Sequence, residues 1–174
     1  MISIKSINVR SNSLNKLTTD LLVLGQKEGG SLSGLDSDLN DIVISAISLE
    51  SFTGKSGKAI HTYGDGTTKR VSVFGLGEDG KLTSDGLRAL ASKISAYANS
   101  LKLESFSVDG DSFGLNDSDF AQAFSEGLVL GAYEFLNYKS KKKDSNTLNS
   151  INILGNVDAS SITKGEVIAN GVAF

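Results

Sequence analysis

Apolar residues along the chain follow two periods, one typical of strands and one typical of helices. Short apolar or alternating stretches predict six strands, at residues 2–9, 21–24, 58–63, 69–74, 106–108 and 151–154. Between the later strands, apolar residues recur with helical spacing. They predict helices capped by Ser37 and by Thr83 or Ser84, and helices that begin at Asn116 or Ser118 and at Ser160 or Ser161.

The order of these elements is strand-strand-helix-strand-strand-helix-strand-helix-strand-helix. Strands and helices alternate in the second half, which predicts an α/β fold with a mostly parallel, mixed sheet and helices on both faces. A turn around Asp65-Gly66 makes the third and fourth strands a hairpin. Gly127 and Gly131 lie on the inward face of the third predicted helix. Since glycine weakens a helix, these two positions indicate a close approach to a neighbouring element.

The composition limits the class of protein but does not indicate a reaction. The chain has 174 residues, 39% of them hydrophobic and 21% charged, so one globular domain is expected. A net charge of -3 argues against a nucleic-acid partner for the domain as a whole. There is no cysteine, which excludes disulfides, a thiolate nucleophile and a cysteine-based zinc site and fits a reducing compartment. The N-terminus resembles a strand and not a signal peptide, and no apolar run is long enough to span a membrane.

The segment Gly75–Gly80 matches the G-x-G-x-x-G pattern of dinucleotide-binding loops. Glu78 and Asp79 would place two negative charges beside a pyrophosphate, and the helix cap comes only at Thr83 or Ser84. The next strand ends at Asp109, beyond the ~20 residues expected for the ribose-binding acid. These departures favour a plain glycine-rich turn between strand and helix.

Two further motifs are weaker. Gly54-Lys55-Ser56 matches the end of a P-loop, but Leu49 stands where its first glycine is required, so a surface turn is favoured. His61 is the sole histidine of the sequence, and a metal site around it would need carboxylates alone to complete it. A structural or solvent-facing histidine is the simpler interpretation.

The remaining candidates are charged residues. The run Lys139–Lys143 could contact phosphate, but it is more simply a solvated segment after a helix C-terminus. Four acids are interpreted as turn and helix-capping residues: Asp109, Asp111, Asp117 and Asp119. No residue is therefore assigned a catalytic, cofactor-binding or metal-binding role.

Several segments together resemble a known family. They are Phe52–Gly57, Lys69–Gly77, Lys81–Thr83 with Leu87-Arg88, and Phe124–Phe135 running into Tyr138–Lys142. In this order and spacing they resemble the N-terminal domain of the leucyl aminopeptidase (cytosol aminopeptidase, peptidase M17) family, over nearly the whole chain. The ending Ala169–Phe174 is similar to the family's connecting helix.

The resemblance implies a three-layer, macro-domain-like α/β fold for residues 1–158. It implies that residues 159–174 begin a helix leading to a catalytic domain absent from this chain. That domain would hold two divalent metal ions, zinc or manganese, and none of their ligands maps onto residues 1–174. The resemblance also implies a cytoplasmic homo-hexamer that acts on peptides, in which this domain is inactive alone and aids assembly.

Two rival functions remain open. One is a free-standing module of macro-domain type that binds a nucleotide or ADP-ribose at the glycine loop. The other is a DNA-binding accessory role, found in some bacterial members of the family, for which the net charge of -3 gives no support.

Overall fold

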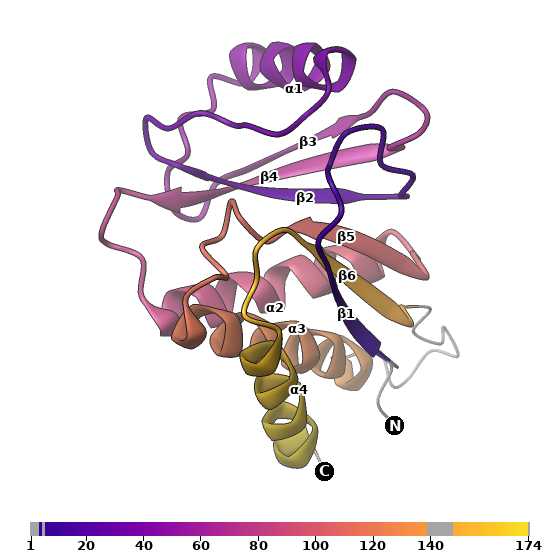
Figure 1. The fold of residues 1–174 in the computed structure, drawn as a ribbon, viewed down its shortest axis with the longest axis vertical. Helices are drawn as coiled ribbons and strands as arrows, with labels where there is room; N and C mark the ends of the chain where they lie inside the picture. The colour runs from indigo at the N-terminus through magenta and orange to yellow at the C-terminus, as the bar shows by residue number, and fades with distance from the viewer. Residues whose placement is uncertain (1–3, 5, 139–147, 174) are drawn as a thin grey trace.

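The computed structural model describes residues 4, 6–138 and 148–173, with the side chains of 134–138 and 172–173 left undescribed. The elements follow the predicted order (Figure 1). The strands are β1 (Ser6–Arg10), β2 (Leu22–Lys27), β3 (Ala59–Tyr63), β4 (Arg70–Gly77), β5 (Ser105–Asp109) and β6 (Ser150–Leu154). The helices are α1 (Ser37–Leu49), α2 (Ser84–Ser100), α3 (Ser118–Tyr138) and α4 (Ala159–Ala173).

The strands form a single six-stranded sheet in the order β1-β6-β5-β2-β4-β3. All neighbours are parallel except β3, which pairs antiparallel with β4. The predicted hairpin is thus confirmed, and its turn is held by Asp65, whose carboxylate accepts hydrogen bonds from the amides of Thr67 and Thr68. The predicted α/β class with a mixed, mostly parallel sheet is also confirmed.

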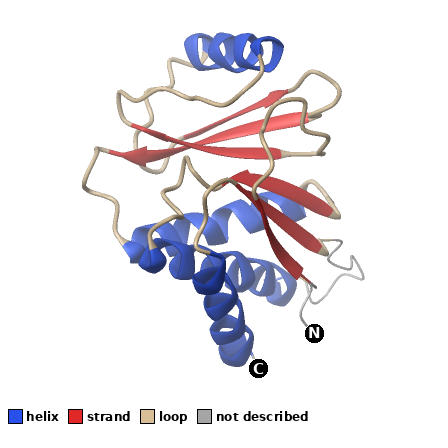
Figure 2. Ribbon diagram, in the orientation of Figure 1, coloured by secondary structure: helices blue, strands red, loops and turns tan. Residues whose placement is uncertain are grey.

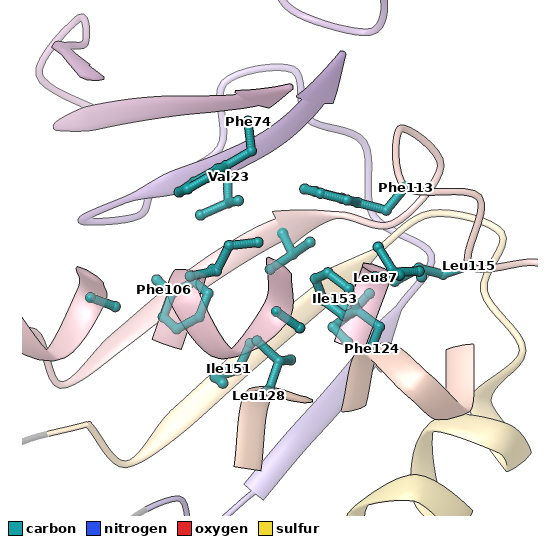
Figure 3. Packing of buried hydrophobic residues seen from close by; sticks show 14 of the residues in the cluster. Val23, Phe74, Leu87, Phe106, Phe113, Leu115, Phe124, Leu128, Ile151 and Ile153 are labelled. Carbon is teal, nitrogen blue, oxygen red and sulfur yellow. The ribbon is translucent and has the colours of Figure 1, made fainter. Parts of the chain in front are cut away.

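Helices cover both faces of the sheet and make it the middle of three layers (Figure 2). On one face, α2 and α3 pack against all the central strands, and Phe106, Phe124 and Ile153 lie in the middle of this larger core (Figure 3). On the other face, α1 packs through Leu39 and Val43 onto the β2, β3 and β4 half of the sheet. Helix α4 packs on α3 and reaches β1.

Helix α2 touches α3 backbone to backbone. A β-carbon on Gly127 would overlap the carbonyl oxygen of Arg88, and one on Gly131 would overlap the backbone of Ser92. Ser92 and Ser95 of α2 donate hydrogen bonds to the carbonyls of Gly127 and Leu128, at 3.0 and 2.7 Å. The predicted close approach at the two glycines is confirmed.

The predicted start of α3 at Ser118 is confirmed, whereas the predicted cap of α1 and the predicted start of α4 were wrong by one residue or more. Asp36, and not Ser37, caps α1, because its carboxylate accepts the amide of Leu39 at 3.0 Å. Asp158 caps α4 ahead of Ser160 and Ser161, and Asp117 accepts the amide of Phe120 at the start of α3. Aspartate and serine cap helices about equally well, so neighbouring candidates cannot be ranked from sequence. Thr83 caps α2, which confirms one of the two predicted capping residues.

Two strands run further than predicted. Strand β4 continues through Gly75-Leu76-Gly77, so the first half of the predicted glycine-rich turn is extended sheet. Strand β2 continues to Lys27, three residues past its predicted end at Leu24. In both cases pairing with the neighbouring strand outweighs the low strand preference of glycine and polar residues. No helix of the described chain is long and apolar enough to cross a membrane.

Candidate functional site

The sheet opens between β2 and β5 at the carboxyl ends of the strands. These two strands pair only at Leu22–Ser107 and Val23–Val108. Beyond that point β2 follows β4 as far as Lys27, while β5 follows β6 as far as Asp109. The chain leaves β2 toward one side of the sheet and leaves β5 toward the other, which is the arrangement at which open α/β sheets hold ligands.

A crevice of about 420 Å³ lies at this opening, and we call it the strand-end crevice. It is lined by residues 12–14, 25–27, 30–34, 109, 111–112 and 154–155. These segments follow β1, end β2 and β5, and leave β6, so residues distant in the chain meet because parallel strands bring their carboxyl ends to one edge.

Ser112 joins the two strands where their ladder stops. The amide of Gly25 donates to the Ser112 hydroxyl at 2.9 Å, and that hydroxyl donates to the carbonyl oxygen of Asp109 at 2.8 Å. A side chain thus replaces the backbone bond that the splayed strands lack. Nearby, the Asp111 carboxylate accepts the amide of Asn156 at 2.9 Å and occupies the space that a β-carbon on Gly155 would need.

Asp109 is the buried acid of the strand-end crevice, with 7% of its surface exposed. Its pKa is raised from 3.8 to about 6, first by burial and then by the negative charge of Asp111. Hydrogen bonds from the amides of Ser112 and Asp111 oppose part of this increase. The carboxylate is therefore largely ionised near neutral pH but is poorly compensated, which is a property of groups that meet a ligand.

Gln26 is the second buried polar residue of the strand-end crevice. It is 6% exposed, and its Oε1 has no hydrogen-bond partner in the structure. Alternation along β2 places Gln26 on the face of Leu22 and Leu24, which pack under α1. Alternation along β5 places Asp109 on that same face, because Val108 points to the opposite core.

The cation lining the strand-end crevice has another partner. Lys27 forms an ion pair with Asp79 at 2.7 Å, and both side chains are exposed. The two acids Asp109 and Asp111 are thus set against one lysine that is already paired. The crevice is suited to a ligand that brings hydrogen-bond donors or a positive charge, and it is unsuited to an anion.

The two glycine motifs lie side by side and contribute no residue to the lining of the strand-end crevice. The amide of Gly77 donates to the carbonyl of Gly54 at 2.9 Å, and a β-carbon on Gly75 would overlap the carbonyl of Lys55. These glycines let the 54–56 loop pack against β4, which is a structural role. The hollow beside them has mixed charge, with Lys55 and Lys81 near Glu28 and Glu78.

His61 lies on β3, where its Nδ1 is 2.7 Å from the Ser72 hydroxyl and its ring stacks on Tyr97 at 4.1 Å between centroids. Burial lowers its pKa from 6.5. Among the described residues, no three histidine, aspartate or glutamate side chains gather as a metal site. The structure thus brings His61 together with a serine and an aromatic ring, and not with carboxylates.

The acids interpreted as turn residues divide into two groups. Asp117 caps α3 and Asp119 is exposed in its first turn, as expected of such residues. Asp109 and Asp111 instead line the strand-end crevice, and sequence reasoning missed them together with Gln26 and Ser112. Their signal was an acid placed directly after an apolar strand, but it gains meaning only once the strand order is known. The lysine run 139–143 lies outside the described residues.

Comparison with known proteins places these features in a wider group. The family model described as "Cytosol aminopeptidase family, N-terminal domain" matches residues 23–142. A probable cytosol aminopeptidase of Sulfurihydrogenibium is 31% identical over 97% of this chain and 36% of its own length. Leucine aminopeptidase A2, chloroplastic, of Solanum lycopersicum is 31% identical over 86% of this chain and 28% of its own length.

Solved structures agree with the family match. A mutant of tomato leucine aminopeptidase superimposes with a TM-score of 0.76 at 25% identity, over 99% of this chain and 36% of that one. The bottromycin maturation enzyme BotP superimposes with a TM-score of 0.65 at 19% identity, over 88% of this chain and 31% of that one, which is a likeness of fold. The chain spans about a third of the length of the relatives it matches.

Proposed function

Since the chain belongs to the cytosol aminopeptidase family through its N-terminal domain, we propose that it is the non-catalytic N-terminal domain of a metal-dependent leucyl aminopeptidase. The whole enzyme would remove N-terminal residues from peptides. The observation that carries the proposal is the family match, joined to a relative that aligns with 97% of this chain but only 36% of its own length.

The proposed division of the chain assigns residues 1–158 to a macro-domain-like unit and residues 159–174 to the start of a helix that connects to a catalytic domain outside this chain. Helix α4 supports this division. Its Gly165 packs closely on Ser125 and Gln122 of α3, whereas Val167 and Ile168 are 66% and 41% exposed. Apolar side chains left on the outer face of an anchored helix suit a contact with a further domain or subunit. Val172 and Phe174 lie outside the described side chains.

The peptide chemistry belongs to the proposed catalytic domain, where two divalent metal ions, zinc or manganese, would activate water and polarise the peptide carbonyl. The related enzyme BotP has been solved in complex with Mn. The described residues of the present chain do not fit such a site, because they include no group of three or more metal-ligating side chains. No step of hydrolysis is assigned to them.

The proposal also includes assembly of the whole protein into a cytoplasmic homo-hexamer, which this domain would aid. Nucleic acid is not proposed as a partner, given the net charge of -3. The glycine loop is not proposed as a site for nucleotide or ADP-ribose, because Gly75 and Gly77 pack on the 54–56 loop. Titration of ADP-ribose, and of DNA at several salt concentrations, separates these rivals from the assembly role.

Two experiments test the proposal. The purified chain is assayed on leucine p-nitroanilide with added zinc or manganese, and no hydrolysis is expected. Hydrolysis that a chelator abolishes would contradict the non-catalytic role. The gene is also sequenced beyond the codon for Phe174. The proposal expects an open reading frame that encodes a cluster of aspartate, glutamate and lysine residues. A stop codon in place of that frame would refute the proposed catalytic domain.

A further inference from the structure

We propose that the strand-end crevice binds a small aliphatic amine as its ammonium ion, which donates hydrogen bonds to the Asp109 carboxylate and to Gln26 Oε1. The crevice lies on a part of the chain that the aminopeptidase proposal does not use. The two inferences therefore stand or fall separately.

The charge of the strand-end crevice selects a cation. Asp109 and Asp111 both line it, and the pKa of Asp109 is raised first by its burial and then by the negative charge of Asp111. Lys27 does not neutralise them, because its ammonium lies 2.7 Å from Asp79. An ammonium ion placed at Asp109 would offset both the burial of that carboxylate and its repulsion by Asp111.

The unpaired oxygen of Gln26 selects a ligand with N–H groups. Gln26 is 6% exposed, so water has little access to its amide, and Oε1 is left without a donor. A buried acceptor in this state costs free energy until a donor reaches it. An ammonium group has three N–H donors, enough for Asp109 and Gln26 together.

The walls of the strand-end crevice select an aliphatic body for the ligand. Leu14, Leu32 and Leu154 line it, and Leu14 and Leu154 are 7% and 2% exposed. These residues belong to the α1 side of the core and come from three separate segments. A volume of about 420 Å³ is at the small end of the range for ligand sites, which suits a short branched chain.

The test uses 3-methylbutylamine as the probe and 3-methyl-1-butanol as its neutral counterpart of nearly equal shape. Both are titrated into the ¹⁵N-labelled chain at pH ~8, where Asp109 with its pKa of about 6 is ionised. The amine is expected to give saturable shifts at the amides of Gly25, Gln26 and Ser112. The alcohol is expected to bind at least roughly tenfold more weakly.

Variants assign the effect to the proposed residues. Asp109→Asn is expected to weaken amine binding by roughly tenfold or more, and Gln26→Met by several-fold. Asp119→Asn makes the same change of charge on the exposed first turn of α3 and should leave the affinity unchanged. Equal binding of amine and alcohol, an unchanged affinity in Asp109→Asn, or shifts scattered outside the crevice would each overturn the proposal. The absence of saturable shifts with the amine would do so as well.

Discussion

Gly127 of α3 lies directly against the carbonyl oxygen of Arg88 in α2, with no space between them for a β-carbon. Hydrogen bonds from Ser92 and Ser95 to α3 carbonyls hold the two helices at this separation. Because the obstacle is backbone and not a flexible side chain, a larger residue at this position must push the helices apart.

Substitution of Gly127 by alanine is therefore expected to lower the free energy of unfolding by about 2–4 kcal/mol, despite alanine's better helix propensity. Gly171→Ala is the matched control. It changes a glycine of α4 at which an added β-carbon would meet no described atom within 4 Å apart from its chain neighbours and the backbone of its own helix, and a gain of about 0.5–1 kcal/mol is expected there. Urea denaturation followed by circular dichroism gives both values. Equal effects at the two positions would mean that α2 and α3 are not in close contact.

The buried carboxyl of Asp109 predicts a pH-dependent gain in stability on its removal. Its pKa is about 6 when folded and 3.8 in the reference state, so ionisation favours unfolding. Its favourable contribution is complete below pH 3.8 and is lost as the pH rises through 6. Asp109→Asn should thus stabilise the protein by about 1–3 kcal/mol at pH ~8 and by almost nothing at pH ~4. Denaturation curves at both pH values, with Asp119→Asn as control, test this. A destabilised Asp109→Asn at the higher pH would show that the carboxylate is better compensated than its surroundings indicate.

Arg88 of α2 forms ion pairs with two acids, Asp85 of the same helix and Glu126 of α3. Its Nε donates to Glu126 at 2.8 Å, and Gln122 donates to the other oxygen of Glu126 at 2.9 Å. Glu126 is 9% exposed, so Arg88→Ala leaves a buried carboxylate with one fewer partner. A loss of about 1–3 kcal/mol is expected.

A double-mutant cycle of Arg88→Ala with Glu126→Gln isolates this interaction. The exposed pair of Lys27 and Asp79 supplies the comparison, and Asp79→Ala is expected to cost much less stability than Arg88→Ala, because water screens the pair. A coupling energy near zero between Arg88 and Glu126 would contradict a structural role for their contact.

His61 offers a direct measurement, because its imidazole signals are the sole histidine signals of the chain. Burial lowers its pKa from 6.5, so protonation favours unfolding and stability is lost as the pH falls through the folded pKa. The Ser72 hydroxyl, 2.7 Å from Nδ1, can donate to the neutral ring. Ser72→Ala is therefore expected to raise the pKa of His61 toward 6.5.

Proton NMR titration of the His61 ring measures that pKa in the parent and in Ser72→Ala. Thr62→Ala serves as control, since its hydroxyl bonds the carbonyl of Tyr63 and not the ring. A fall in the pKa of His61 in Ser72→Ala would show that the serine accepts a hydrogen bond from a protonated ring.

Most helices and strands can be predicted from the sequence because the apolar residues of each element have their own periodicity. Leu21–Leu24 shows a buried strand, and Leu87 to Leu101 shows a helix, without reference to any other segment. The local sequence does not decide which of two adjacent residues caps a helix when both are of a capping type. Asp36 and Ser37 are both good caps, and only the position of Leu39 in the finished helix decides between them.

The strand-end crevice could not be predicted because it depends on strand order. Asp109 and Gln26 are 83 positions apart, and each alone is an ordinary residue at the end of a strand. They become neighbours only because β5 lies beside β2, an arrangement that the helical connections leave open. The glycine motif Gly75–Gly80 suggested a ligand-binding loop that the structure does not support. Its pattern is local, but Gly75 and Gly77 serve contacts with the 54–56 loop that the pattern does not contain.

Because β1 pairs with β6, β1 cannot pair during synthesis until most of the chain has been made. Strand β1 lies at the edge of the sheet, and its one neighbour there is β6, formed by residues 150–154. Ribosomes add ~5–20 residues per second, so Ser6 waits on the order of 10 s before Ser150 exists. During that interval β1 offers unpaired backbone groups to other chains, and so does the β6-facing edge of β5 once residues 105–109 have been made. A translational pause before residue 154 would lengthen this exposure, so the codons between β5 and β6 bear on how much of the protein escapes aggregation during synthesis.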